Sequence, residues 1–367
     1  MDAVSDQTTA VTTATGNAFS GAVVSGSVDV QSDQSMQGGA DAHGVLNVAT
    51  DAGLSVSMTA AATGNAGEAD SLGGGALTGA FRQDTGAVAI SAVNQIEGED
   101  AQAGNITNSA QAIANTQGLG ADGASITAAV SQSSAASVTA DGGAILRYTP
   151  GTASFAATAV GNNLTTAGTG GSDQTLTVDQ SNTGDLTQAA QFIAMGNAQT
   201  ISNNAMATGN TISAANQGSS LELTSSQDNA SYVRAQAENT TYQYGINSSS
   251  ATGVGNSVIA GQTGDSLTID NTQFNRGGGV EVIATASGAD GYDISASATA
   301  MGNAITGFAC STCGGRMTVR NSQSNSADIG ATSSVSVSPP GASARSAGGV
   351  STAVGNTATF YVSAPGS

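Results

Sequence analysis

The sequence predicts an all-β fold, a β-solenoid (β-helix-like) built from about eight repeats of about 48 residues. Three observations predict it: a Gly-Asn pair that recurs at a nearly constant spacing, a second marker with the same period, and alternation of apolar and polar residues between the markers. A fixed period of this length is typical of stacked repeat architectures. We therefore expect residues 1–367 to form a single repeat domain.

The first marker has the form Ala-x-Gly-Asn, as in Ala14–Asn17, and it sets the repeat boundaries. Repeats start near residues 16, 64, 114, 161, 209, 255 and 302, between partial repeats at 1–16 and 355–367. We interpret the Gly-Asn pairs as turns, because both residues tolerate left-handed backbone conformations. The alternative is an asparagine ladder along the stack. The asparagines are Asn17, Asn65, Asn115, Asn162, Asn210, Asn256, Asn303 and Asn356.

The second marker is an apolar residue followed six positions later by glutamine, as in Leu77 and Gln83. Glutamine has no special turn preference, whereas stacked side-chain amides bond one another along a β stack. We therefore expect a structural ladder formed by Gln34, Gln83, Gln132, Asn182, Gln227, Gln273 and Gln323, in which Asn182 substitutes for glutamine. Asn229, Asn275 and Asn325 each lie two residues after a ladder glutamine and hint at a paired turn.

Between the markers the pattern has period two, as in Leu267-Thr268-Ile269, which is typical of strands. Glycine-rich turns are expected at 168–171 and 277–279. Each repeat then contains three or four short strands, and we expect two coils per repeat, divided between the Gly-Asn pair and the glutamine segment.

The composition agrees with a thin β fold. Charged residues make up 9% of the chain, aromatic residues 4%, and 50 of the 367 residues are glycine, so the side chains are too small for a thick core. Disorder is the alternative for such a composition, but two markers that share one period exclude it for most of the chain. The net charge of −19 and the absence of lysine exclude nucleic acid as a partner and disfavour anionic lipid.

The sequence offers little for catalysis or metal binding. His43 is the only histidine, so an ordinary catalytic triad is excluded. Cys310 and Cys313 form a Cys-x-x-Cys pair that we interpret as a local disulfide in an oxidising compartment, because a zinc site would need two further ligands. The acidic cluster Glu97–Asp100 is interpreted as a solvated loop, with a weak calcium site as the alternative. No catalytic residue, metal or cofactor is predicted.

The repeat style of Ala205–Asn210, and the curlin-like segment Gln180–Gly184, resemble the holdfast anchor protein D family of stalked, holdfast-forming alphaproteobacteria. The resemblance covers nearly the whole chain. It implies an anchor exported to the outer membrane that forms stable high-mass assemblies and attaches an adhesive polysaccharide, the holdfast, to the cell. It also implies two partners, a curlin-like anchor protein and a curli-type secretion lipoprotein.

We therefore expect a structural or adhesive cell-surface protein that is not an enzyme. The alternatives are a polysaccharide-binding module and a solenoid enzyme that degrades polysaccharide; an enzyme would gather acidic, basic or histidine side chains at one level of the stack. The first residues lack a signal peptide, so Met1 is interpreted as a start codon added to a mature, secreted sequence.

The chain ends predict a head-to-tail homopolymer. The first residues are the tail of a repeat and the last are the head of one, and the two pieces together have 29 residues, close to one coil if each repeat holds two. Phe360, Tyr361 and Val362 form the strongest β-forming segment and are the candidate polymer interface. A contact of this kind does not close, so it makes a filament.

Overall fold

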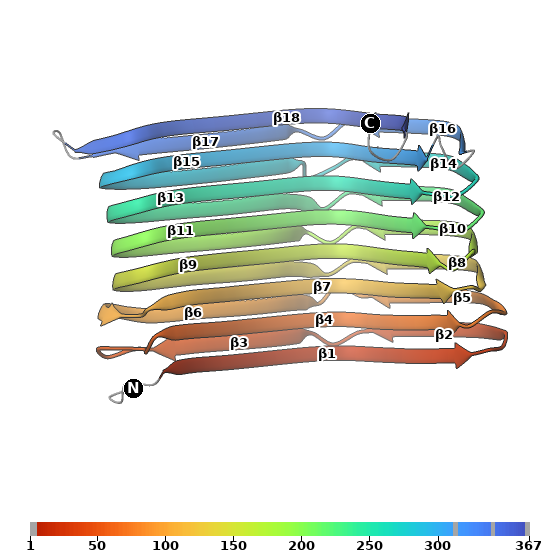
Figure 1. Cartoon of the computed structure of the whole chain (residues 1–367), viewed down its shortest axis with the longest axis horizontal. Coiled ribbons are helices and arrows are strands. Elements are labelled where there is room, and N and C mark those ends of the chain that lie inside the picture. Colours follow the sequence, from red (N-terminus) through yellow and green to blue (C-terminus); the bar gives the residue numbers. More distant parts are fainter. Residues whose placement is uncertain (1–5, 311–314, 339–341, 364–367) are drawn as a thin grey trace.

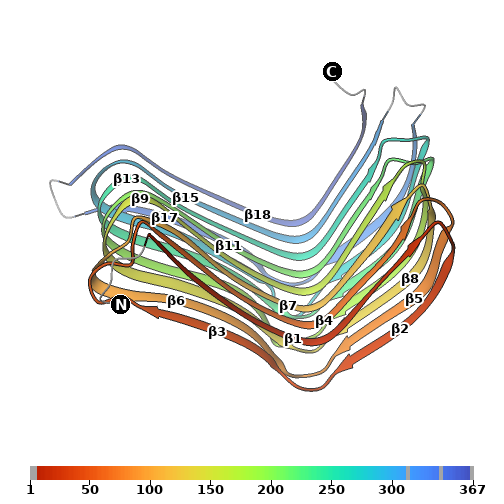
Figure 2. The same cartoon turned by 60° about the horizontal axis from the view of Figure 1, so that its bottom comes forward.

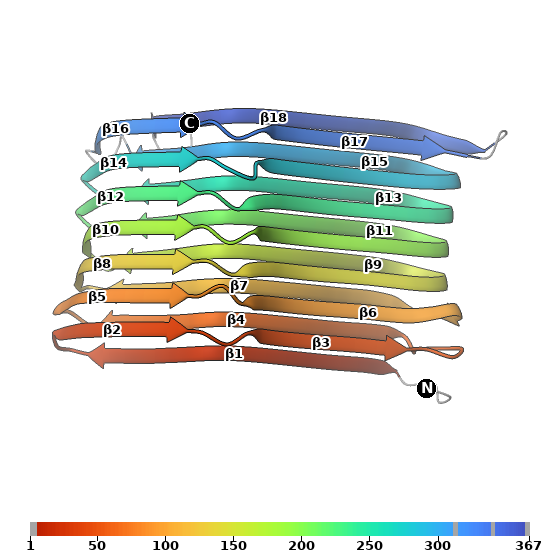
Figure 3. The same cartoon turned by 180° about the vertical axis from the view of Figure 1, so that it is seen from behind.

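The computed structural model describes residues 6–310, 315–338 and 342–363. The described residues form eighteen β-strands and no helix. Successive coils lie on top of one another, so that every strand runs parallel to its neighbours along the stack (Figures 1 and 3). The expected all-β, solenoid class is confirmed. None of the described residues forms a helix long and apolar enough to cross a membrane.

The first coil shows the path of the chain. It consists of β1 (Gln7–Val24), β2 (Val28–Met36) and β3 (Ala40–Asn47). The second coil consists of β4 (Ser55–Leu72), β5 (Ala76–Thr85) and β6 (Ala89–Gln102). The third coil begins with β7 (Asn105–Asp122) and β8 (Ser125–Ser134). From there the end of one coil and the long wall of the next are a single strand, as in β9 (Ser137–Thr169), β11 (Leu186–Asn216), β13 (Tyr232–Gln262) and β15 (Val280–Cys310). The remaining strands are β10 (Asp173–Asn182), β12 (Ser220–Asn229), β14 (Ser266–Asn275), β16 (Arg316–Asn325), β17 (Ile329–Val337) and β18 (Ser343–Ser363).

The strands form two parallel sheets. Seven short strands, from β2 to β16, make one sheet, and the other strands make the second, eleven-stranded sheet. The two walls of each coil face one another and both are bent, which gives the stack an open V in cross-section (Figure 2). Asn17 pairs with Asn65 and Asn65 with Asn115, so one coil takes one full period. The expectation of two coils per repeat was wrong.

The reason lies at the Gly-Asn pairs, which are not turns. Asn17 lies inside β1, and the seven other asparagines of the series lie inside β4, β7, β9, β11, β13, β15 and β18. The long wall therefore continues through each marker, and the chain reverses elsewhere. The glycine-rich turns expected at 168–171 and 277–279 do connect strands, where Gly170, Gly171, Gly277 and Gly279 have positive φ.

The core is thin in its middle and thicker at its two ends. The middle cluster consists mainly of alanine with a few valines, whereas larger side chains gather in the two outer clusters, around Leu77, Phe81 and Leu176 in one and Ile96, Phe155 and Ile201 in the other. A few larger side chains, Met36, Ile90, Ile294 and Tyr244, also belong to this middle cluster. Small residues therefore do not prevent burial here; they set the thickness of the solenoid.

The glycines of the interior markers are required by close packing, both against the facing wall and against the next coil of the same wall. A Cβ on Gly255 would lie 2.5 Å from Asn275 Oδ1 and 2.5 Å from the carbonyl oxygen of Gly302. One marker has alanine, Ala114, in place of glycine. In its coil, Ser134 takes the position that Asn182, Asn229 and Asn275 occupy in later coils. The smaller serine leaves space for that alanine.

Replacing Gly255 by alanine is expected to destabilise the stack by about 1–3 kcal/mol, because both carbonyl groups must move away from the new methyl group. Chemical denaturation followed by circular dichroism measures the change. Gly330→Ala is the matched control, because a Cβ there meets nothing within 4 Å. Equal midpoints for the two variants would show that the walls can separate without cost.

Candidate functional surfaces

A row of glutamine side chains crosses the short sheet. Each interior glutamine donates from Nε2 to Oε1 of the glutamine in the preceding coil, at 2.7–2.8 Å, and also to a backbone carbonyl of the facing wall. The row consists of Gln34, Gln83, Gln132, Gln180, Gln227, Gln273 and Gln323. The sequence pattern placed Asn182 in this row, six residues after Leu176, but Gln180 is the member. In the register it is Gln174, six residues before Gln180, that pairs with the apolar Ile126 of the preceding coil.

Asn182 belongs to a second row. Its Nδ2 donates to Asn229 Oδ1, Asn229 donates to Asn275, and Asn275 donates to Asn325, at 3.2, 2.9 and 2.7 Å. Each of these asparagines is the last residue of a short strand, directly before the link to the next strand, and its side chain joins the row. The signal for this row was their regular position two residues after each glutamine.

The asparagines of the Gly-Asn markers form a third row, in the long wall. Each donates from Nδ2 to Oδ1 of the asparagine in the following coil, at 2.7–2.8 Å, from Asn17 to Asn356. The second hydrogen of Nδ2 goes to a backbone carbonyl of the facing short strand, such as Phe274 O for Asn256. The interior asparagines of this row are fully buried; both hydrogens of each Nδ2 are donated and each Oδ1 accepts at least one bond.

The long-wall and glutamine rows have opposite directions. The asparagines donate towards the C-terminal end of the stack, whereas the glutamines donate towards its N-terminal end. At the C-terminal end, no bond from Asn356 Nδ2 occurs among the described residues, and Gln323 Oε1 accepts only at 3.4 Å, from Asn321 of its own strand. At the N-terminal end, within the same described residues, Asn17 Oδ1 accepts no bond and Gln34 Nε2 donates only to Ala66 O.

The candidate polymer interface lies on β18, which pairs only with β15 among the described strands. Phe360 packs against one of the outer core clusters, and the Tyr361 ring stacks on Phe308 with 6.0 Å between centroids. Val362 and Tyr361 are about half exposed. The aromatic residues thus hold the last strand to the coil before it.

The other residues considered from the sequence are distributed along the stack. Cys310 is disulfide-bonded, and Cys313 lies outside the described residues. His43 is exposed on β3. Glu97–Asp100 lies in β6, where the register with β9 shifts, and is not a separate loop. In the described part of the chain no three His, Cys, Asp or Glu side chains gather as metal ligands would.

The charged side chains pair from coil to coil on the outer surface. Five arginine–carboxylate pairs do so, and Arg320 with Asp270 at 2.9 Å is one of them. Exposed pairs of this kind contribute little stability. Tyr232 donates to Glu281, and burial together with that carboxylate raises the pKa of Tyr232 to about 12.

These features define a structural class: a parallel β-solenoid whose repeated amide side chains point inward and join successive coils in rows. The family model for holdfast attachment protein D matches residues 2–279. The chain belongs to this family. Its function is holdfast attachment, a structural and adhesive role at the cell surface in association with the holdfast. No curated protein and no solved structure matches the chain.

Proposed function

We propose that the chain is a secreted anchor which attaches the holdfast polysaccharide to the outer membrane through a head-to-tail polymer of its own copies. The observation that carries the proposal is the opposite direction of the long-wall asparagine row and the glutamine row. A fibre of this kind is amyloid-like in its backbone pairing and its amide ladders. The role is non-enzymatic, and the adhesive character of the family supports it.

The two ends of the stack have matching strand edges. The N-terminal end has β1, β2 and β3 as edges, with 18, 9 and 8 residues, and the C-terminal end has β18, β16 and β17, with 21, 10 and 9 residues. The outer strand of a sheet is a template for pairing with another chain. Since all strands are parallel, one copy continues the next without any change of direction.

The side chains select the same orientation. When the C-terminal end of one copy meets the N-terminal end of the next, Asn356 Nδ2 faces Asn17 Oδ1, and Gln34 Nε2 faces Gln323 Oε1. Two C-terminal ends together would place donor against donor and acceptor against acceptor. The contact is therefore heterologous, and it makes an open filament rather than a closed ring. The interface extends beyond Phe360–Val362 to the amide rows.

The curlin-like anchor protein and the curli-type secretion lipoprotein remain proposed partners, by resemblance. A polysaccharide-binding module is the second candidate function, since attachment requires a contact with the holdfast. Both functions fit one molecule, because polymerisation uses the ends of the stack and leaves its outer surface free.

Blocking either end is expected to abolish filaments in negative-stain images. The N-face variant carries Asn17→Leu and Gln34→Leu, and the C-face variant carries Gln323→Leu and Asn356→Leu. Each keeps one intact end, so an equimolar mixture should give dimers in analytical ultracentrifugation, whereas each variant alone stays monomeric.

Gln243→Leu, on the outer surface in mid-stack, is the control and should polymerise as the parent does. Filaments that persist after deletion of residues 355–367, or a mixture of the two variants that does not dimerise, would overturn the proposed polymer.

A further inference from the structure

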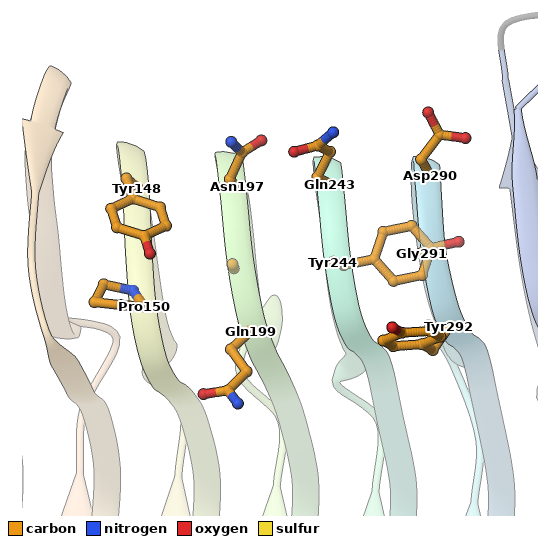
Figure 4. Close-up of a pocket in the computed structure, with 10 residues that line it drawn as sticks. Tyr148, Pro150, Asn197, Gln199, Gln243, Tyr244, Asp290, Gly291 and Tyr292 are labelled. Carbon is orange, nitrogen blue, oxygen red and sulfur yellow. The ribbon is translucent and has the colours of Figure 1, made fainter.

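A shallow groove runs along the stack over its rounded end, where each coil passes from its returning wall into the next long wall. Its largest part has a volume of about 610 Å³ and is drawn in Figure 4. A part of about 320 Å³ adjoins it at Tyr148 and Asn197, and a smaller part adjoins it at Pro150. The three parts share lining residues, so they form one continuous depression.

One register position supplies a continuous row of polar side chains along this groove. Six successive coils place there Asp51, Gln102, Tyr148, Asn197, Gln243 and Asp290, each paired with the next. The coils are about 4.8 Å apart, so the row spans about 24 Å along the stack. In order along the stack these side chains are a carboxylate, an amide, a phenol, two amides and a carboxylate, and Arg147 lines the groove beside Tyr148.

The outward amides differ from those of the inner rows. Asn197 and Gln243 lie in neighbouring coils at paired positions, as the inner asparagines do. Neither side-chain amide, however, makes a hydrogen bond to any residue in the described ranges. Figure 4 shows both side chains projecting away from the wall. Their donors and acceptors are therefore available to a ligand.

Aromatic rings stand beside the amides. Tyr148 is 42% exposed and Tyr292 is 64% exposed, and the Arg345 guanidinium lies 5.6 Å from the centroid of the Tyr292 ring. Tyr244 is nearly buried: its ring lies across Gly291, where a Cβ would collide with it. The Tyr244 hydroxyl is buried and has no hydrogen-bond partner among the described residues, and burial, with Asp290 and Asp293, raises its pKa.

We propose that this groove binds an extended, neutral glycan chain that lies along the stack axis. Exposed tyrosine rings pack against the C–H faces of sugar rings, and outward amides and carboxylates donate to and accept from hydroxyl groups. The coil spacing is close to the rise of one pyranose in an extended chain, so successive coils meet successive sugars. The backbone here is already paired along the stack, which excludes recognition by strand addition.

The groove carries more negative than positive charge, which favours a neutral chain. Asp51, Asp100 and Asp290 line it against one lining arginine, Arg147, and the whole molecule carries a net charge of −19. A polyanion would be repelled by this excess of carboxylates. This inference rests on the proposed attachment function, for which it gives the place of the sugar contact, and it leaves both ends of the stack free.

The test is isothermal titration calorimetry of the full chain with cellohexaose, chitohexaose and oligogalacturonate. We expect at least one neutral hexamer to bind, more tightly than its own dimer and more tightly than oligogalacturonate. Tyr148→Ala and Tyr292→Ala should each weaken binding by roughly two- to tenfold, and the double variant should bind no sugar. Tyr242→Ala, which removes a 61% exposed tyrosine that lies outside the groove, is the control and should bind as the parent does.

Failure to bind either neutral hexamer, tighter binding of oligogalacturonate, or unchanged affinity in the double variant would overturn the proposal. Loss of filaments in the double variant would also overturn it, because the groove would then serve contact between copies. The proposed polymer is tested separately by the variants at the two ends, which keep the groove intact, so the two failures are distinguishable.

Discussion

A chain with Gln227 replaced by leucine is expected to unfold at a much lower urea concentration than the parent. Gln227 donates to Gln180 Oε1 at 2.8 Å and to Ser257 O at 3.1 Å, and it accepts from Gln273 Nε2 at 2.8 Å. Leucine leaves all three groups without this partner in a fully buried site. Each unsatisfied buried group costs about 1–3 kcal/mol. Gln273→Leu should give the same result.

The measurement is urea denaturation followed by far-ultraviolet circular dichroism. Gln243→Leu is the control, because this exposed glutamine makes no hydrogen bond to the described residues and its replacement should leave the midpoint unchanged. Midpoints of Gln227→Leu and Gln273→Leu that equal the parent value would mean that the glutamine row adds nothing to stability.

The second large effect is expected from Asn256→Asp, and it should depend on pH. Asn256 is fully buried; it donates to Phe274 O at 2.7 Å and to Asn303 Oδ1 at 2.8 Å. A carboxylate cannot donate, so it would face two acceptors, and an unpaired charge in this site is costly. The variant should therefore be strongly destabilised at neutral pH.

The sign of the pH dependence follows from burial, which raises the pKa of the new carboxyl in the folded state above its unfolded value of about 3.9. The protonated carboxyl donates one hydrogen bond. The loss of stability is therefore smallest at a pH below the unfolded pKa of about 3.9, and it grows as the pH rises through the folded pKa. Melting temperatures from pH 3 to pH 8 measure this. Asn47→Asp, on the exposed side of β3, should follow the parent at every pH; a pH-independent loss in Asn256→Asp would contradict the expectation.

Much of the fold could be predicted from the sequence because a solenoid repeats its physical environment. The same position in each coil meets the same neighbours, so the need for Gln83, Gln132 and Gln227 appears as a period. The pattern pointed to Asn182 because it counts six residues from an apolar residue, here Leu176. In this coil the polar Gln174 pairs with Ile126 and so takes the position that is apolar in other coils. The register, which is a property of the paired backbone, was needed to identify Gln180.

The Gly-Asn markers could not be assigned from residue preferences alone. Glycine and asparagine favour turns, but Gly255 is required because a side chain of the facing wall and a carbonyl of the next coil leave no space for a Cβ. Asn256 is required for its amide. The groove was also beyond sequence analysis, since Asp51, Gln102, Tyr148 and Asn197 share no residue type and only the pairing of the coils brings them into one row.

The hydrogen bonds between coils point along the stack axis, which has a mechanical consequence for a filament. Tension along the axis loads all the bonds between two coils together, while successive coils bear the same load one after another. The filament is then only as strong as its weakest joint. A joint between copies would match the interior in tensile strength only if all three edge strands at each end are paired. A partner that covers one edge strand would leave fewer hydrogen bonds at that joint, and that joint would then set the breaking force of the filament.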